Sequence, residues 1–170
     1  MKNLLKVAAV ALCMLLIGNF AKAQTKIGYV AIDQIIPLLP EYKTAQQVVN
    51  NYQQNYIDQI NKIATELQNR AKDYDAKKAT MNEAARAATE SELADLQKRG
   101  NDLQTKAQQD VPAKGDEQMQ PLVTKVKTAV SAVAKEKGYT YVINASQTDL
   151  LVAPEGDNLL AAVKLKLGLK

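Results

Sequence analysis

Apolar and small residues recur along residues 44–79 at steps of three and four, with mostly charged or amide side chains between them. The mean step of 3.6 is that of an α-helix, and the stretch contains no Gly or Pro. The pattern therefore predicts one long amphipathic helix with a narrow apolar stripe, roughly 55 Å long at about 1.5 Å per residue. The stripe comprises residues 45, 49, 52, 56, 60, 63, 67, 71 and 74.

A second long helix is predicted after residue 80. Thr80 with Glu83 three residues later is a capping-box pattern, which marks a helix start. Apolar residues then continue at helical spacing, at Leu93, Leu96, Leu103 and Ala107. Two long helices with a tight junction form an antiparallel hairpin. A single uninterrupted rod through residue 80 is the alternative.

Three helix breakers interrupt the returning segment, within "QQDVPAKGDEQMQPL" (residues 108–122): Pro112, Gly115 and Pro121. An interior proline costs a helix about 3 kcal/mol. We expect a kink or short break at residues 112–115, with Pro121 beginning a new helix at the root of the arm. The stretch is either a static kink or a hinge that opens the arm.

Short strands are predicted near both ends of the chain, in "KIGYVAID" (26–33), "YTYVINAS" (139–146) and "DLLVA" (149–153). The first long helix should begin at Pro40, since proline is favourable at the first helical position. A valine stripe at 126, 130 and 133 braces the base of the second helix, which should end at Gly138. A short last helix is predicted over residues 159–167.

The first 23 residues have the features of a secretory signal peptide. Lys2 and Lys6 precede an apolar run that is too short to cross a bilayer comfortably, and Ala21-Lys22-Ala23 forms a small-x-small cleavage site. A retained membrane anchor is the alternative, and the exact cleavage site is open. Removing the three lysines of this leader from the 22 basic residues leaves 19, against 18 acidic residues.

The composition excludes several classes of function. Cys13 and Phe20 lie in the leader, and the chain has no His or Trp, so ordinary zinc sites and Cys/His nucleophilic pairs are excluded. We expect no catalytic, metal or cofactor-binding residues and no enzyme activity. Residues 62–114 carry ten basic and nine acidic residues, which does not support nucleic-acid binding.

The predicted fold is α+β, with a long antiparallel helical-hairpin arm (44–121) on a small β body (24–43 and 122–170). A body of three short strands and one short helix has a marginal core and open sheet edges, and a closed cyclic oligomer would cover both. Seven residues are expected in the body of this oligomer: Ile27, Val30, Ile32, Val142, Ile143, Leu150 and Val152. Seven others are expected to face the arm core or another protein bound by the arm: Tyr52, Tyr56, Ile60, Ile63, Leu67, Tyr74 and Met81.

The order of elements resembles the Skp/OmpH family of periplasmic chaperones over residues 25–168. The resemblance rests on "KIGYVAIDQII", "LPEYKTAQ", "MNEAARAATESEL" and "PLVTKVKTAVSAVAKEKGYTYVINAS". It implies a periplasmic homotrimer whose three arms enclose unfolded outer-membrane proteins without using ATP. Unlike the strongly basic arms of well-studied relatives, these arms are nearly neutral. The client's identity and any peripheral contact with membrane lipid or lipopolysaccharide stay open. A structural coiled-coil envelope protein without clients is the alternative.

Overall fold

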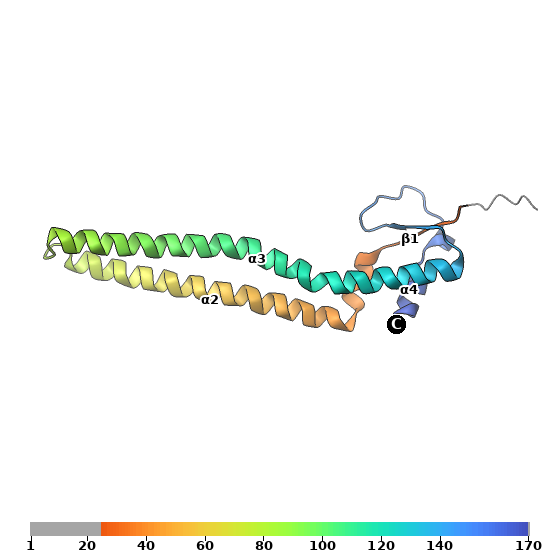
Figure 1. The fold of residues 1–170 in the computed structure, drawn as a ribbon, viewed down its shortest axis with the longest axis horizontal. Coiled ribbons are helices and arrows are strands. Elements are labelled where there is room, and N and C mark those ends of the chain that lie inside the picture. The colour runs from red at the N-terminus through yellow and green to blue at the C-terminus, as the bar shows by residue number, and fades with distance from the viewer. Residues whose placement is uncertain (1–24, 170) are drawn as a thin grey trace, which may run out of the picture.

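The structure, a computed structural model, describes residues 25–169, so the predicted leader lies outside the described residues. A long two-helix arm extends from a small body built of both described ends of the chain (Figure 1). The arm is formed by α2 (Pro40–Lys77) and α3 (Glu83–Lys137). The body contains the strands β1 (Ile27–Val30) and β2 (Tyr141–Asn144), the helix α4 (Leu160–Lys166) and the root of α3.

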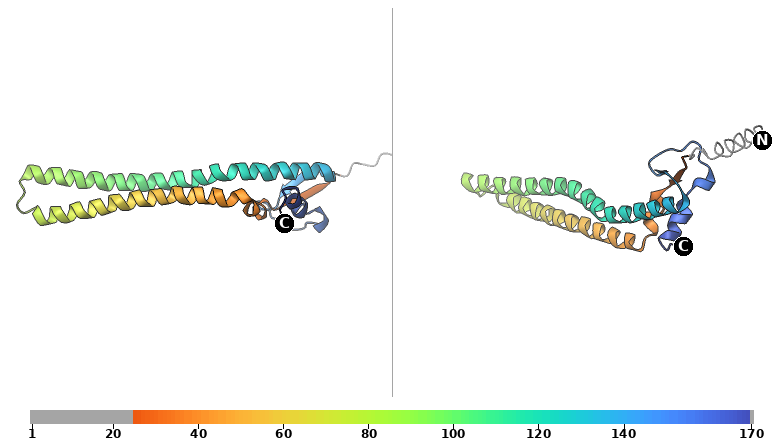
Figure 2. Two further views of the ribbon diagram at one scale, coloured as in Figure 1. Left: turned by 90° about the horizontal axis from the view of Figure 1, so that it is seen from below. Right: turned by 45° about the vertical axis from the view of Figure 1, so that its right-hand side comes forward.

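The two helices of the arm lie side by side and antiparallel, as three views of the ribbon agree (Figures 1 and 2). The predicted pair of antiparallel helices is thus confirmed, and the single rod through residue 80 is wrong. α2 begins at Pro40 as expected, and its 38 residues give a length of about 57 Å. Because residues 78–82 form the turn, the tip of the arm is short.

The start of α3 differs from the predicted capping box. Asn82 is the N-cap, and its Oδ1 accepts a hydrogen bond from the Ala85 amide at 2.8 Å. The Thr80 hydroxyl instead donates to the Lys77 carbonyl at 2.9 Å, at the end of α2. Asn is as good an N-cap as Ser or Asp, so the residue directly before the helix takes the role. At the other end, Gly138 adopts the left-handed conformation with a φ of 71° and ends α3 as predicted.

α3 runs without a break through all three predicted breakers, so the expected break and the new helix at Pro121 are wrong. Both prolines are exposed, as are residues 108 and 117, whose carbonyls lose their usual donors. Water can reach these carbonyls, which removes much of the reason to end the helix. α3 does bend in its teal stretch (Figures 1 and 2), as expected for a helix that contains proline.

The sheet consists of β1 and β2 paired in parallel, from Ile27 opposite Tyr141 to Val30 opposite Asn144. A parallel pair needs a long crossover, and here the whole arm supplies it. The predicted strand at 149–153 is wrong, because this segment is a loop in which Leu151 and Val152 are 90% and 91% exposed. Among the described residues, pairing beyond these two strands is limited to a bridge between Tyr29 and Asn158.

The hydrophobic core lies in the body, where the root of α3 packs against β1 and α4. Val126 and Val133 of the predicted valine stripe are buried there, and Val130 packs against the cluster from its edge. Glycine suits position 28 in this packing, because a Cβ atom there would lie tightly at 3.0 Å from the Tyr139 ring and 3.2 Å from Leu159. The core comprises Val30, Ile35, Leu39, Leu122, Val126, Ala129, Val133, Tyr139, Leu159 and Val163.

Candidate functional site

The predicted stripe of α2 is the surface along which the arm closes. All nine of its positions are buried or half-buried, whereas every other residue from 46 to 79 is exposed. Six of the predicted arm residues lie in this seam, and Met81 is half-buried in the turn at the tip. The buried seam is therefore one residue wide, and most of the arm's surface faces solvent. The six are Tyr52, Tyr56, Ile60, Ile63, Leu67 and Tyr74.

A polar cluster joins the two helices beside the bend of α3. The Tyr56 side chain is 8% exposed, and its hydroxyl donates to Asp110 Oδ2 at 2.5 Å. Lys106 Nζ lies 2.8 Å from the same oxygen. The Tyr52 ring packs edge-on against the Tyr56 ring, with the two ring centroids 5.4 Å apart. The hydrogen bond from Lys106, followed by that from Tyr56, holds the pKa of Asp110 below its usual value. The Asp110 carboxylate in turn raises the pKa of Tyr56.

Further polar contacts connect α2 with α3 toward both ends of the arm. Near the tip, the Tyr74 hydroxyl donates to Glu90, which raises the pKa of Tyr74, and Arg70 Nη1 contacts Glu92 Oε2 at 2.6 Å. Near the body, Lys125 donates to Glu41, and this hydrogen bond lowers the pKa of Glu41. Glu90 and Glu92 thus each contact a different residue of α2, and both connect the helices of the hairpin.

We expect the arm to lose stability in acid through Asp110. Its pKa is lower in the folded state than in the unfolded chain, so its contribution is fully present above the unfolded value and is lost as pH falls through the folded value. The melting temperature should therefore fall as the pH drops below about 4, the ordinary pKa of an aspartate in an unfolded chain. Asp110→Asn should flatten this dependence when melting is followed by circular dichroism. An unchanged pH profile in the variant would rule out this role for Asp110.

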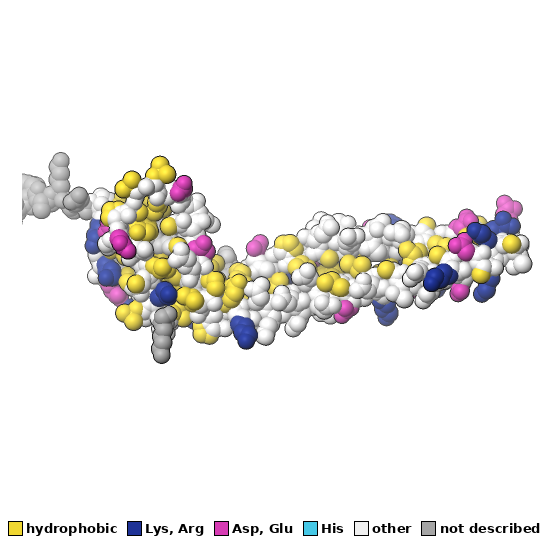
Figure 3. All heavy atoms as spheres, turned by 180° about the vertical axis from the view of Figure 1, so that it is seen from behind, with side chains coloured by type: hydrophobic (Ala, Val, Ile, Leu, Met, Phe, Trp, Pro, Cys, Tyr) yellow, Lys and Arg dark blue, Asp and Glu magenta, His cyan; other side chains and the backbone are white. Residues whose placement is uncertain are grey.

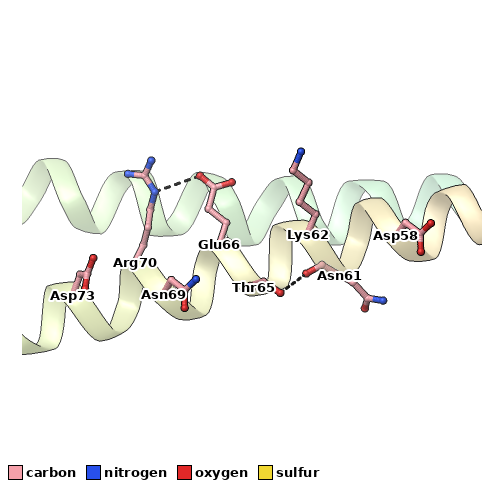
Figure 4. A pocket seen from close by; sticks show the side chains of 8 residues that line it. All are labelled: Asp58, Asn61, Lys62, Thr65, Glu66, Asn69, Arg70 and Asp73. Carbon is pink, nitrogen blue, oxygen red and sulfur yellow. Dashed lines mark hydrogen bonds and ion pairs between the residues drawn. The ribbon is translucent and has the colours of Figure 1, made fainter.

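A shallow hollow of about 620 Å³ lies on one face of α2 alone (Figure 4). Its side chains alternate in charge along the helix, and Arg70 Nε lies 3.4 Å from Glu66 one turn away. The Thr65 hydroxyl donates to the Asn61 carbonyl at 2.9 Å within the same helix. Exposed pairs of this kind stabilise a helix by a few tenths of a kcal/mol. This face is a solvated helix surface.

The residues predicted for the trimer body differ in their exposure. Val30 belongs to the protomer's own core, and Ile32 and Val142 pack against that core. Ile27 is 49% exposed and Val152 is almost fully exposed, whereas Ile143 and Leu150 are half-buried. Tyr141, which is not among the predicted residues, is 61% exposed beside Ile27 on the neighbouring strand. A role in assembly stays a prediction for all of them.

Within 25–169, the acidic side chains form no group of three or more that could hold a metal ion. None of the helices in the same range combines the length and apolarity needed to cross a bilayer. The molecule instead presents two kinds of surface. The long arm carries many exposed amide side chains. The body exposes hydrophobic side chains (Figure 3).

Comparison with known proteins gives one consistent result. The model of the family described as "Outer membrane protein (OmpH-like)" matches residues 26–167. Chaperone protein Skp from Photorhabdus luminescens is 26% identical over 164 residues, 96% of this chain and 97% of that protein. The crystal structure of an OmpH-like protein from Caulobacter crescentus shares the fold, with a TM-score of 0.64 at 20% identity over 83% of this chain and 82% of that one. The chain therefore belongs to the OmpH-like outer membrane protein family.

Proposed function

We propose that this protein is an ATP-independent holdase chaperone of the periplasm, which keeps unfolded outer-membrane proteins from aggregating. Membership of the OmpH-like family supports this, as does similarity to a protein named as a chaperone. The observation that carries the proposal is the arm. It buries only a one-residue-wide seam and presents the rest of a helix about 57 Å long to its surroundings.

The surface of the arm suits weak binding of many different segments. Beside the seam, α2 carries a group of exposed side-chain amides close to the root of the arm. An amide both donates and accepts hydrogen bonds, but it gains little over its bonds with water, so each contact with a client is weak. Many such contacts act together when one chain is held along a whole arm, so binding can be strong overall without any strong single contact. The exposed amides are Gln46, Gln47, Asn50, Asn51, Gln53, Gln54 and Asn55.

The exposed surface of the body supports assembly into a homotrimer. Leu151 and Val152 are almost fully exposed, and Ile27 and Tyr141 are about half or more exposed on adjacent strands. A two-stranded sheet is marginal by itself and leaves strand edges that favour pairing with another chain. A closed ring of three protomers would cover these groups and place three arms around one space.

The experiment that tests this function is suppression of aggregation. An unfolded outer-membrane β-barrel protein is diluted from urea with or without one trimer per client, and turbidity is followed without nucleotide. A holdase keeps the client soluble. If turbidity develops as fast as with an inert protein, the alternative of a structural envelope spacer is the better account.

Client binding should depend only weakly on salt. Residues 62–114 carry ten basic and nine acidic residues, so long-range attraction contributes little. We expect the dissociation constant for an unfolded client, measured by fluorescence, to change less than about threefold between about 50 and 300 mM salt. A loss of binding of about tenfold or more over this range would show that charge dominates capture.

The bend of α3 is proposed to act as a hinge between arm and body. Gly115 has open space around its Cα, so packing does not require a glycine there, and Pro112 lies one turn before it. Pro112→Ala with Gly115→Ala should slow amide hydrogen exchange over residues 108–121 and narrow the range of client sizes protected. Gly156→Ala, which also fills open space but lies in the body, is the control. Unchanged exchange over 108–121 would favour a static kink.

A further inference from the structure

A groove of about 340 Å³ opens between α2 and α3 in the middle of the arm. Its floor is aliphatic: Ile60, Ile63 and Leu67 project from the seam of α2, and Leu96 projects from α3. Leu96 is only 4% exposed, whereas the three α2 side chains are half-buried and reachable from outside. An aliphatic floor of this kind can take apolar side chains from another molecule.

The groove includes a glycine that the fold does not need. Gly100 lies inside α3, where glycine is unfavourable relative to alanine. A Cβ atom there would meet only Ile63 Cγ2, at 3.5 Å, which is ordinary contact. At Gly28, by contrast, a Cβ atom would lie much closer to its neighbours, at 3.0 Å from Tyr139 and 3.2 Å from Leu159. Packing between the helices would therefore accept the methyl group of an alanine at position 100, and glycine leaves that part of the groove open.

The rim of the groove is uncharged. Gln68 lines it from α2, and Gln97, Asn101 and Gln104 line it from α3; every described residue that lines it lacks a charge. Gln97 donates to Asn101 Oδ1 at 3.1 Å, and each amide offers further donors and acceptors. Figure 3 shows hydrophobic atoms along the seam with mostly uncharged atoms beside them in the middle of the arm, whereas charges of both signs gather at its tip.

We propose that this groove binds an extended, uncharged segment of unfolded polypeptide with apolar side chains at alternate positions. The proposal rests on the proposed holdase function and assigns one binding site to it. An extended segment offers unpaired N–H and C=O groups that the rim amides can pair, and its apolar side chains can reach the aliphatic floor. A charged segment would lose water without gaining a partner of opposite charge.

The length of the groove sets the length of the segment. Its α2 side extends from Ile60 to Ala71, which is about 16 Å along the helix. An extended chain covers about 3.3 Å per residue, so about five residues fit. Such a segment matches part of a transmembrane β-strand, in which lipid-facing apolar residues alternate with others.

The test uses the purified protein and two fluorescent peptides of about ten residues, one alternating Val with Thr and one alternating Val with Glu. Binding is measured by fluorescence anisotropy for the wild type and for two variants with the same new side chain. Gly100→Leu fills the groove, and Ala94→Leu adds leucine at an exposed position of α3 outside it. Gly100→Ala adds only a methyl group, which fits at ordinary contact distance. Its affinity for the peptide should lie between those of the wild type and Gly100→Leu.

We expect the wild type to bind the Val-Thr peptide about tenfold more tightly than the Val-Glu peptide. Gly100→Leu should weaken the Val-Thr complex about tenfold, Gly100→Ala less, and Ala94→Leu by less than about twofold. The proposal would be overturned if Gly100→Leu bound the Val-Thr peptide as tightly as the wild type does. It would also be overturned if both leucine variants lost the same affinity for this peptide. A second copy of the chain in the groove would overturn it as well, seen as an oligomer mass that falls in Gly100→Leu while the wild type does not bind the Val-Thr peptide. If the wild type protects an unfolded barrel protein from aggregation but does not bind the peptide, only the groove proposal is wrong. If it protects no unfolded protein, the proposed holdase function is wrong.

Discussion

Replacing Leu151 and Val152 together with serine is expected to convert the proposed trimer into folded monomers. In the single protomer these side chains are 90% and 91% exposed, so their removal costs the protomer almost nothing. In a trimer each buried side chain of this size contributes about 1.5–3 kcal/mol, and the loss is repeated at every interface. The effect on assembly should therefore be large while the effect on folding is small.

Light scattering for the mass and circular dichroism for the helix content distinguish these effects. Val48 and Ile57 are 37% and 39% exposed on the arm, so Val48→Ser with Ile57→Ser removes two exposed apolar side chains away from the body. This control should keep the trimer mass. A Leu151→Ser/Val152→Ser protein that also keeps the trimer mass would exclude the loop from the interface.

Replacing Leu159 with alanine is expected to destabilise the body by about 2–5 kcal/mol, the usual range when a fully buried leucine is truncated. Leu159 is 1% exposed in the hydrophobic core and lies against Gly28. Its backbone amide donates to the Tyr29 carbonyl at 2.9 Å, and that bond is available to alanine as well. The loss should therefore come from the side-chain cavity in a small core.

Urea unfolding followed by circular dichroism measures this cost. Leu151→Ala makes the same chemical change at a side chain that is 90% exposed, and in the monomeric state it should alter stability by less than about 0.5 kcal/mol. If Leu159→Ala unfolds at the urea concentration of the wild type, the body core contributes less than its burial indicates.

The helices could be predicted well from the sequence, because each depends on local periodicity. The stripe from Ala45 to Tyr74 predicted which residues of α2 are shielded, position by position. Pro40 and Gly138 marked helix ends through their own backbone preferences, which need no distant partner.

The wrong predictions concern features that depend on distant contacts or solvent. Residues 149–153 have the composition of a strand, but a strand also needs a neighbouring edge, and the described residues leave this segment unpaired. The stretch around Pro112 was expected to break α3, but exposure of the freed carbonyls to water lets the helix continue.

The polar contacts across the arm were missed for a different reason: they join residues far apart in sequence. In an antiparallel hairpin, facing residues are about equally distant from the turn, so their residue numbers have a nearly constant sum. This sum lies between 162 and 166 for three pairs: Tyr74 with Glu90, Arg70 with Glu92, and Tyr56 with Asp110. A hairpin with its turn at 78–82 imposes this register. Once the turn was placed, acidic residues facing the tyrosines of the stripe could have been found from the sequence.

The mass of the complex with an unfolded client tests the central claim most directly. The protein is mixed without nucleotide with one unfolded outer-membrane β-barrel protein, and the eluting species is weighed by light scattering after size-exclusion chromatography. A holdase trimer predicts a species of three chains plus one client. A protein that elutes at its own mass while the client is lost to aggregation would contradict the account.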